Sequence, residues 1–360
     1  MSAFQVKIVG DFCNLRCKYC FNCNGKRSTK TIMHLDVLEK VFKVLSQSKQ
    51  ETIRVHWHGG ESLLAGIDFF ERIIAHEKKI SDKRFVNIIQ TNATLVTKDW
   101  ADFLFQNHFH IGVSIDGDEA MHNLNRVYEN GQGSYKDTLR GANILRSVGF
   151  KVGVICTVTK ETIASGKKGF LSLVKNDFNS VAFNAFHEES DLFEVRNVSN
   201  NEWLDFLKDI FDTWIELNDD KIRVREIDRI LAWVEGRVAN TCAFKSTCAN
   251  WFTIDWDGLI YPCERIGRVP KFGDINKLDS FDEIFQTEEF ANWSHKLHIL
   301  PDKCKKCSMV ELCNNGCTSH RIKKDEIPHF VYCDAQLSFF DYIKDQIGVY
   351  SKKKEVICNG

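Results

Sequence analysis

The feature that most constrains the fold is a regular alternation of strand-like and helix-like segments over roughly the first 220 residues. Strands separated by helices pair in parallel through right-handed crossovers. Six such units predict an α/β fold, a partial (β/α)6 TIM-like barrel, with functional residues at the carboxyl ends of the strands. The strand-like runs are residues 4–9, 52–57, 84–90, 110–115, 151–158 and 180–186. The segments with helical periodicity are residues 38–45, 69–79, 97–107, 135–148, 169–175 and 201–218.

Composition narrows the class of protein further. A chain of 360 residues with 43% hydrophobic residues can bury a sizeable core in two or three units. Its formal net charge of −1 favours neither nucleic acid nor a membrane surface as a partner. It contains no apolar stretch of about 18 residues and no secretory signal region. We therefore expect a cytoplasmic protein with no nucleic-acid or membrane partner.

Three cysteines follow the first predicted strand at the spacing CxxxCxxC, namely Cys13, Cys17 and Cys20. A [4Fe–4S] cube held by cysteine takes four thiolates, so three leave one iron open for a ligand that is not protein. A zinc site and buried free thiols are the alternatives. Zinc usually takes four ligands in paired motifs, and a fourth is not evident in this loop. The spacing therefore favours an iron–sulfur cluster with an open iron.

Short polar strings follow the next predicted strands. His58-Gly59-Gly60-Glu61-Ser62 follows the second, Gln90-Thr91-Asn92 the third, and Ser114-Ile115-Asp116-Gly117 the fourth, with His122 and Arg126 beyond it. Paired glycines let a backbone approach a ligand closely, and Glu61 can accept a hydrogen bond from an ammonium group. Arg126 is suited to pairing with a carboxylate. Each string alone could be an ordinary turn or surface residue, whereas their order on successive strands favours a ligand site.

Together these strings resemble the radical SAM superfamily, which uses an iron–sulfur cluster to cleave S-adenosylmethionine (SAM). The resemblance implies that Cys13, Cys17 and Cys20 hold that cluster, beside the aromatic Tyr19. It implies that Gly59, Gly60 and Glu61 bind the SAM amino group. It also implies that Asn92, Ser114 and Arg126 help to hold the ribose and carboxylate of SAM. Ser62 stands where this superfamily usually has proline.

The character of the chain changes after about Val238. Strand–helix alternation stops, turn-rich pieces dominate, and eight of the fourteen cysteines fall between Cys242 and Cys333. We expect a barrel over residues 1–237, a cysteine-rich domain over 238–333 that does not rely on an apolar core, and a C-terminal helix (roughly 334–348) and tail over 334–360. Clustered cysteines in a cytoplasmic chain indicate metal binding rather than disulfides. Of the other cysteines, Cys156 lies in an apolar strand and is expected to be buried packing, and neither Cys23 nor Cys358 is assigned a role.

The cysteines of the second region resemble the SPASM domain, which carries auxiliary iron–sulfur clusters. Eight thiolates suffice for two fully ligated [4Fe–4S] clusters, which would bring the total to three. A zinc ribbon is the alternative. By resemblance, one cluster near the active site is held by Cys242, Cys248, Cys263 and Cys317, and an outer one by Cys304, Cys307, Cys313 and Cys333.

The layout resembles two groups of enzymes, the anaerobic sulfatase-maturating enzymes and the SPASM maturases of ribosomally made peptides. Both abstract hydrogen from a side chain with a 5′-deoxyadenosyl radical and then remove an electron and a proton. In sulfatase maturases an aspartate directly follows the cysteine that Cys263 matches. In this chain that residue is Glu264, a plausible general base.

Glu264 and Ser62, together with the string Gln90-Thr91-Asn92-Ala93-Thr94, favour a peptide maturase that closes a carbon–carbon or thioether crosslink. The alternative is oxidation of cysteine or serine to formylglycine. Other classes are a multi-cluster electron-transfer protein, which needs no open iron, and a zinc-stabilised binding module. The expected partners are a peptide or protein substrate and an electron donor such as flavodoxin or ferredoxin. Only twelve residues precede Cys13, so we expect no leader-binding domain before it.

Overall fold

A computed structural model describes residues 2–22, 29–189, 194–237, 242–244, 247–322 and 327–358. The contacts group the chain into two compact units. The first comprises residues 1–115, 119–155 and 247–299, and the second comprises 116–118, 156–246 and 300–360. Cys23 lies outside the described residues, and so does the side chain of Cys358.

The first unit is built on parallel strands hydrogen-bonded in the order β8-β1-β2-β3-β4-β5, with β9 and β10 added antiparallel beyond β8. In this register Val6 of β1 lies opposite Trp57 of β2, and Lys7 lies opposite Asp255 of β8. The strands are β1 (Ala3–Lys7), β2 (Thr52–Trp57), β3 (Arg84–Thr91), β4 (His110–Ser114), β5 (Gly153–Val158), β8 (Trp251–Asp255), β9 (Leu259–Tyr261) and β10 (Gly273–Asp274). The last residues of β5 belong to the second unit.

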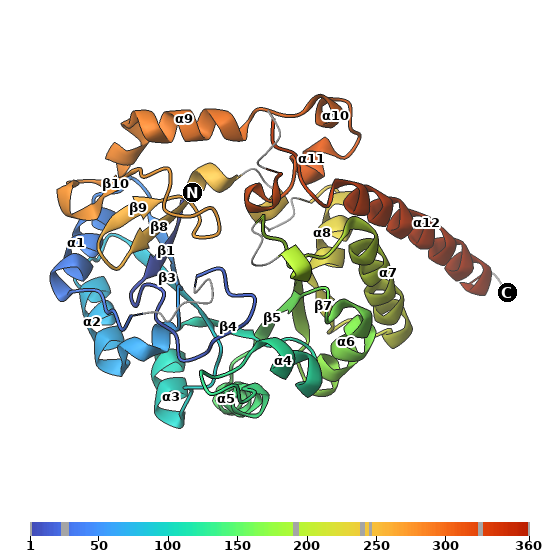
Figure 1. Cartoon of the computed structure of the whole chain (residues 1–360), viewed down its shortest axis with the longest axis horizontal. Coiled ribbons are helices and arrows are strands. Elements are labelled where there is room, and N and C mark those ends of the chain that lie inside the picture. Colours follow the sequence, from blue (N-terminus) through green and yellow to red (C-terminus); the bar gives the residue numbers. More distant parts are fainter. Residues whose placement is uncertain are drawn as a thin grey trace. The chain divides into compact units, whose positions relative to one another are not determined.

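Helices of the first unit lie along the outer side of its strands, as α1, α2 and α3 do in Figure 1. Alternate residues of β2 are buried, and Trp57 packs against Phe70 of α2, which in turn meets Trp100 of α3. The opposite face of the strand carries polar side chains such as His56. The helices are α1 (Leu35–Ser46), α2 (Ile67–Lys78), α3 (Lys98–Gln106), α4 (Glu119–Asn125), α5 (Tyr135–Ser147) and α9 (Glu288–Leu297).

An apolar core lies under the β8–β9 hairpin, contrary to the expectation that the cysteine-rich region would lack one. Phe252 of β8 is fully buried among phenylalanine rings from β1, from the segment after β10 and from α9. The sequence expectation was wrong because the rings come from separate short segments, and only the folded chain brings those segments together. The rings in contact with Phe252 are those of Phe4, Phe272, Phe281, Phe285 and Phe290.

The second unit contains two parallel strands and a set of helices. Helix α12 runs alongside α7 (Figure 1), and Phe211 packs edge-on against Phe339 with ring centroids 6.4 Å apart. Cys156 is buried in β5, as expected. The elements are β6 (Ser180–Ala185), β7 (Arg223–Val224), α6 (Gly166–Lys175), α7 (Asn200–Leu217), α8 (Arg225–Val234), α10 (Asp302–Lys305), α11 (Val310–Cys313) and α12 (Cys333–Cys358).

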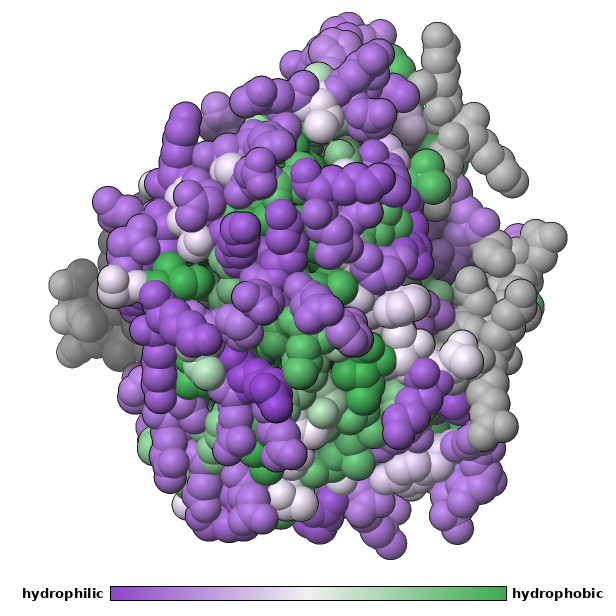
Figure 2. All heavy atoms as spheres, turned by 90° about the vertical axis from the view of Figure 1, so that its left-hand side faces the viewer, coloured by the Kyte–Doolittle hydropathy of each residue, from purple (hydrophilic) through white to green (hydrophobic). Residues whose placement is uncertain are grey.

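The six expected strand–helix units are all present, from β1–α1 to β6–α7. The expectation missed α4, α8, α9, α10, α11 and the strands from β7 onward. Most of these elements are short, and their formation depends on the neighbours that they pack against. Hydrophilic side chains predominate on the face in Figure 2, with apolar patches between them. Among the helices that the structure describes, none is long and apolar enough to cross a bilayer.

Candidate active site

The N-terminal cysteine loop, residues 11–20, follows β1 and is fastened to the end of β2 by backbone hydrogen bonds. The amides of Gly60 and Glu61 donate to the carbonyls of Gly10 and Phe12, each at 2.8 Å. A Cβ on Gly60 would lie 1.9 Å from the Phe12 carbonyl oxygen. The Gly-Gly-Glu string therefore requires glycine at this position because the cysteine loop passes directly against it.

The three thiols of this loop lie close enough to influence one another. Burial raises the pKa of the Cys13 thiol, and the neighbouring Cys17, Glu61 and Cys20 raise it further. Such thiols become thiolates readily only when a cation is bound among them. This donor set therefore fits the positively charged core of an iron–sulfur cluster. Within the described ranges no three His, Cys, Asp or Glu side chains converge on a single ion; a cube instead places each thiolate on a different iron.

Glu61 is 1% exposed and joins the ends of β2 and β3. Its Oε1 accepts from the Thr91 hydroxyl at 2.8 Å and from the Leu63 amide at 3.3 Å, and its Oε2 accepts from the Asn92 amide at 2.8 Å. Burial raises the pKa of Glu61, and these hydrogen bonds oppose that rise. In this structure, Glu61 therefore positions the strand ends around the cysteine loop.

Asn92 points at the cysteine loop from the end of β3. Its amide donates to Asn14 Oδ1 at 2.9 Å and lies 3.9 Å from the Cys13 sulfur. Its own Oδ1 accepts from the backbone and hydroxyl of Thr94, and the Asn14 amide donates to the same hydroxyl at 2.8 Å. A closed amide network thus holds one side of the loop.

Arg126 and Tyr19 form the other side of the loop. The Arg126 guanidinium is 3.9 Å from the Cys17 sulfur and lies over the Tyr19 ring, 5.5 Å from its centroid. Both side chains are buried. Ser114 at the end of β4 accepts from the Gln90 side chain at 2.8 Å. His122 is fully buried beside Ser134, and burial lowers its pKa well below the ordinary value, which indicates a structural role.

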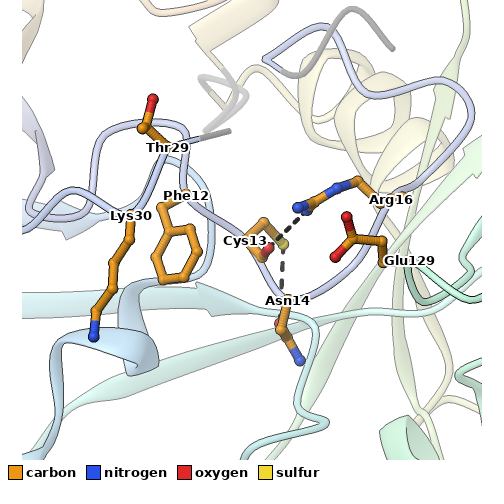
Figure 3. Close-up of a pocket in the computed structure, with 7 residues that line it drawn as sticks. All are labelled: Phe12, Cys13, Asn14, Arg16, Thr29, Lys30 and Glu129. Carbon is orange, nitrogen blue, oxygen red and sulfur yellow. Dashed lines mark hydrogen bonds between the residues drawn. The ribbon is translucent and has the colours of Figure 1, made fainter. Parts of the chain in front are cut away.

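A cavity opens beside the cysteine loop, as Figure 3 shows. Its volume is about 590 Å³. The Arg16 guanidinium reaches back over the loop and donates to the Cys13 carbonyl at 2.8 Å (Figure 3). This site combines an accessible space with the loop that the sequence analysis singled out. The lining residues are Phe12, Cys13, Asn14, Arg16, Thr29, Lys30 and Glu129.

A second polar group lies across β8, β1 and β2. The Glu264 Oε1 lies 2.6 Å from His58 Nδ1, and its Oε2 lies 3.6 Å from the buried Lys7 ammonium. Gln5 contacts the same His58 nitrogen at 3.0 Å. Because β8 pairs in parallel with β1, the turn after β9 brings Glu264 over the ends of β1 and β2.

Glu264 is a buried carboxylate, only 7% exposed, yet it stays ionised. Burial by itself would raise its pKa, but His58 and Lys7 outweigh that effect and hold it at about 2. Glu264 in turn raises the pKa values of His58 and Lys7 against the opposing effect of burial. Its Oε2 is buried without a hydrogen-bond donor among the described residues. That oxygen keeps a lone pair that no described hydrogen-bond donor uses.

The cysteines of the second region divide between the two units. Cys304, Cys307, Cys313 and Cys333 lie in the second unit, and other thiols of this set contribute to raising the pKa values of Cys304, Cys313 and Cys333. These four, called the outer cysteine group below, are linked by these electrostatic influences. Cys242 and Cys317 also belong to the second unit, whereas Cys248 precedes β8 and Cys263 follows β9 in the first.

Sequence reasoning missed Lys7, Gln5 and the role of His58. A signal was available, because Gln5 and Lys7 alternate with Phe4 and Val6 in a strand that is buried on both faces. Polar residues at every second position of a buried parallel strand indicate a functional barrel interior. The contact of Lys7 and His58 with Glu264 could not be predicted, because both residues are more than two hundred positions from Glu264 in the sequence.

Two family models match the chain. The model described as the radical SAM superfamily matches residues 7–166, and the SPASM model, described as an iron–sulfur cluster-binding domain, matches residues 242–308. A cysteine-type anaerobic sulfatase-maturating enzyme of Clostridium perfringens is 30% identical over 94% of this chain and 95% of its own length. A serine-type enzyme of Bacteroides thetaiotaomicron is 27% identical over 97% of this chain and 91% of its own length.

Solved structures agree with these similarities. The structure of native anSMEcpe with bound AdoMet and Cp18Cys peptide has a TM-score of 0.87 and 28% identity, covering 97% of this chain and 99% of that one. Streptococcus suis SuiB bound to the precursor peptide SuiA has a TM-score of 0.66 at 15% identity, covering 93% of this chain and 76% of that one, and shows the fold alone.

The chain therefore belongs to the family of radical SAM enzymes with a SPASM domain that includes the anaerobic sulfatase-maturating enzymes. This confirms the predicted partial barrel with a SPASM domain and the predicted radical SAM oxidoreductase class. Its cofactors are SAM and three [4Fe–4S] clusters.

Proposed function

We propose that this enzyme oxidises the Cβ of a cysteine or serine in a sulfatase polypeptide to the aldehyde of formylglycine. The observation that carries the proposal is the buried Glu264, whose Oε2 has no hydrogen-bond donor among the described residues. It directly follows Cys263 in a chain that resembles sulfatase-maturating enzymes over almost its whole length. Those relatives include both cysteine-type and serine-type enzymes.

When bound, the clusters and SAM supply a carbon radical that removes hydrogen from the substrate and an acceptor for the second electron. The remaining requirement is a base for the substrate thiol or hydroxyl proton. Glu264 Oε2 takes this role in our proposal, while His58 and Lys7 orient the carboxylate. The low pKa of Glu264 keeps the carboxylate ionised before the substrate arrives.

We assign the ligands as the resemblance implies. The cluster that binds SAM lies on Cys13, Cys17 and Cys20, and we propose Tyr19, Gly59, Gly60, Glu61, Asn92, Ser114 and Arg126 as the residues around SAM. The mutual influence of the outer cysteine group supports one further cluster on Cys304, Cys307, Cys313 and Cys333. For the inner cluster we propose Cys242, Cys248, Cys263 and Cys317.

The proposal extends to domains, partners and location. We place the barrel at residues 1–237, the SPASM domain at 238–333 and the tail at 334–360. A flavodoxin or ferredoxin would supply the electron that starts the reaction. Oxygen-sensitive clusters suit the reducing cytoplasm. We propose no nucleic-acid or membrane partner, in keeping with the net charge of −1.

Crosslink formation in a ribosomally made peptide is a second candidate, and a specific observation favours it. Glu264 has one more methylene than the aspartate of sulfatase maturases, so it places its carboxylate about an ångström further from the backbone. A displacement of this size can matter for positioned catalysis. Ser62 is a second departure, since it stands where the superfamily usually has proline. Its buried hydroxyl has no hydrogen-bond partner among the described residues.

The deciding experiment incubates anaerobically reconstituted enzyme, SAM and reductant with matched peptides. One peptide carries the sulfatase motif with cysteine, one carries it with serine, and one is a short precursor peptide with an aromatic residue and a cysteine. An aldehyde that reacts with a hydrazide reagent in the first two supports formylglycine formation. Loss of two hydrogens, with no fragment ions between two residues of the third, would support the crosslink and overturn the main proposal.

A further inference from the structure

Arg229 of α8 is a buried cation that has no role in the proposed reaction. Its side chain is 6% exposed. Its guanidinium lies 3.5 Å from the centroid of the Phe244 ring and donates to Gln336 Oε1 at 2.6 Å. Its Nε has no hydrogen-bond partner among the residues described. A buried charge of this kind is costly unless another charge compensates it.

No carboxylate in the described part of the chain forms an ion pair with Arg229. Glu226, one turn earlier on α8, is the nearest acidic influence on it. However, the Glu226 carboxylate accepts from Arg225 at 2.7 Å and from the backbone amide of Phe183 at 3.1 Å. Burial lowers the pKa of Arg229 to about 10, so the side chain remains charged at neutral pH.

Three contacts tie Arg229 to the segments that carry the cysteines of the second unit. Gln336 lies one turn after Cys333 on α12. Phe244 lies two residues after Cys242, and its carbonyl accepts from Asn314, the neighbour of Cys313, at 3.3 Å. Arg229 and the Cys313 thiol also act electrostatically on each other. The missing counter-charge of Arg229 therefore lies on the side of the outer cysteine group.

We infer that Arg229 is a fixed buried cation that raises the reduction potential of the cluster on the outer cysteine group. This inference rests on the ligand assignment proposed above. A [4Fe–4S] cluster with four thiolates is an anion that gains a further negative charge when it takes up one electron. Net charge and hydrogen bonding around the sulfurs set such potentials, so a buried cation favours the reduced state.

The consequence concerns the direction of electron flow. The oxidation of the substrate releases one electron that the auxiliary clusters must take up. A higher potential at the outer cluster draws this electron away from the substrate. Lys303 also acts on Cys304 and Cys333, but it is exposed, so salt and water screen its charge. Arg229 is buried and is screened much less.

The test is a potentiometric titration of the reconstituted full-length enzyme, followed by electron paramagnetic resonance. Replacing Cys13, Cys17 and Cys20 together, and separately Cys333, by alanine identifies the signal of each cluster. We expect Arg229→Met to lower the reduced-to-oxidised ratio of the outer cluster about tenfold at a fixed potential, or about 59 mV for one electron. Arg229→Lys should retain most of the potential, and Lys303→Gln should produce a smaller shift that disappears in high salt.

Each outcome bears on the inference. Equal shifts for Arg229→Met and Arg229→Lys, or no shift in either, at unchanged iron content and melting temperature, would overturn it. Failure of the ligand assignment is recognised separately. In that case Cys333→Ala would keep its full iron content instead of losing about four irons per chain. If Arg229→Met does not fold, Arg229→Gln replaces it as the charge-removing variant. A potential lower than in wild type would support the inference, and an unchanged potential at unchanged iron content would oppose it.

Discussion

The N-terminal cysteine loop and the outer cysteine group both consist of cysteines, but they differ in the number of thiols and in their surroundings. The loop offers three thiols and is surrounded by hydrogen-bonding groups, with Asn92 and Arg126 each 3.9 Å from a cysteine sulfur. The outer group offers four thiols near a buried arginine. A missing thiol leaves iron open for chemistry, whereas a complete set limits the cluster to electron transfer.

The two regions also differ in how the chain holds them. Backbone hydrogen bonds from Gly60 and Glu61 fasten the loop to the end of β2. In the outer group, Cys304 and Cys313 lie on the four-residue helices α10 and α11, Cys307 lies between these helices, and Cys333 begins α12. Helices of this length are not stable alone. We therefore expect the outer group to depend on its cluster for order and the loop to depend on the barrel.

The largest effect should come from removing one thiol in each region. Cys17→Ala should abolish the production of 5′-deoxyadenosine, because two thiolates cannot hold a cluster in the geometry that binds SAM. Cys333→Ala should leave single-turnover SAM cleavage measurable, because its cluster does not touch SAM in our assignment. Chromatographic measurement of 5′-deoxyadenosine in single-turnover reactions separates the two. Equal loss in both variants would break the distinction.

The next largest effect concerns the proton acceptor. Glu264→Gln should lower peptide oxidation by about 10²- to 10⁴-fold, the usual range for a positioned general base. The formation of 5′-deoxyadenosine should fall far less, because hydrogen abstraction precedes the proton transfer. The matched control is Asp11→Asn, which removes a half-exposed carboxylate 2.5 Å from the same Lys7 ammonium. Product and 5′-deoxyadenosine are measured together; a parallel fall in both would contradict the role of Glu264.

A third prediction tests whether packing or iron holds the hairpin that delivers Glu264. Phe252→Ala should destabilise the first unit by about 3–5 kcal/mol, since Phe252 is fully buried among five other rings. The measurement is denaturant unfolding of the iron-free protein. Hydrogen exchange on the same sample should show β8 protected and α10 and α11 unprotected. Protection lost equally in all three would show that iron organises both regions.

The smallest effect concerns the carboxyl group of Glu77 on α2. Burial raises the pKa of Glu77 from 4.5 to about 7, although the Asn87 amide donates to both of its oxygens. A raised folded-state pKa stabilises the fold below pH 4.5, and this stabilisation is lost as the pH rises through 7. Glu77→Gln should therefore be more stable than wild type at pH 8 by roughly 1–3 kcal/mol, and nearly equal to it at pH 4.5.

Urea unfolding at the two pH values measures this difference. The matched control is Glu71→Gln, an exposed position on the same helix. A Glu77→Gln variant that is less stable than wild type at pH 8 would show that the ionised carboxylate contributes through its bonds to Asn87. In that case those hydrogen bonds, and not the burial of the carboxyl group, would decide how the stability of the first unit responds to pH.

The sequence by itself determined the strand–helix order, and it predicted the cluster-binding roles of most cysteines. Apolar periodicity and the three-cysteine spacing are local properties, and they located β1 to β6 within a few residues. The polar strings at the strand ends could also be identified, because they too are local sequence patterns. Glu264 was found through the residue pattern around Cys263, and its neighbours could not be inferred from that pattern.

Only the tertiary structure brought Glu264 to His58 and Lys7, because it depends on β8 pairing with β1 across some 250 residues of sequence. The aromatic core around Phe252 and the buried cation at Arg229 arise in the same way. Burial, pairing register and the loss of water around a charge depend on what the folded chain places nearby. None of them has a period or a spacing that the linear sequence could display.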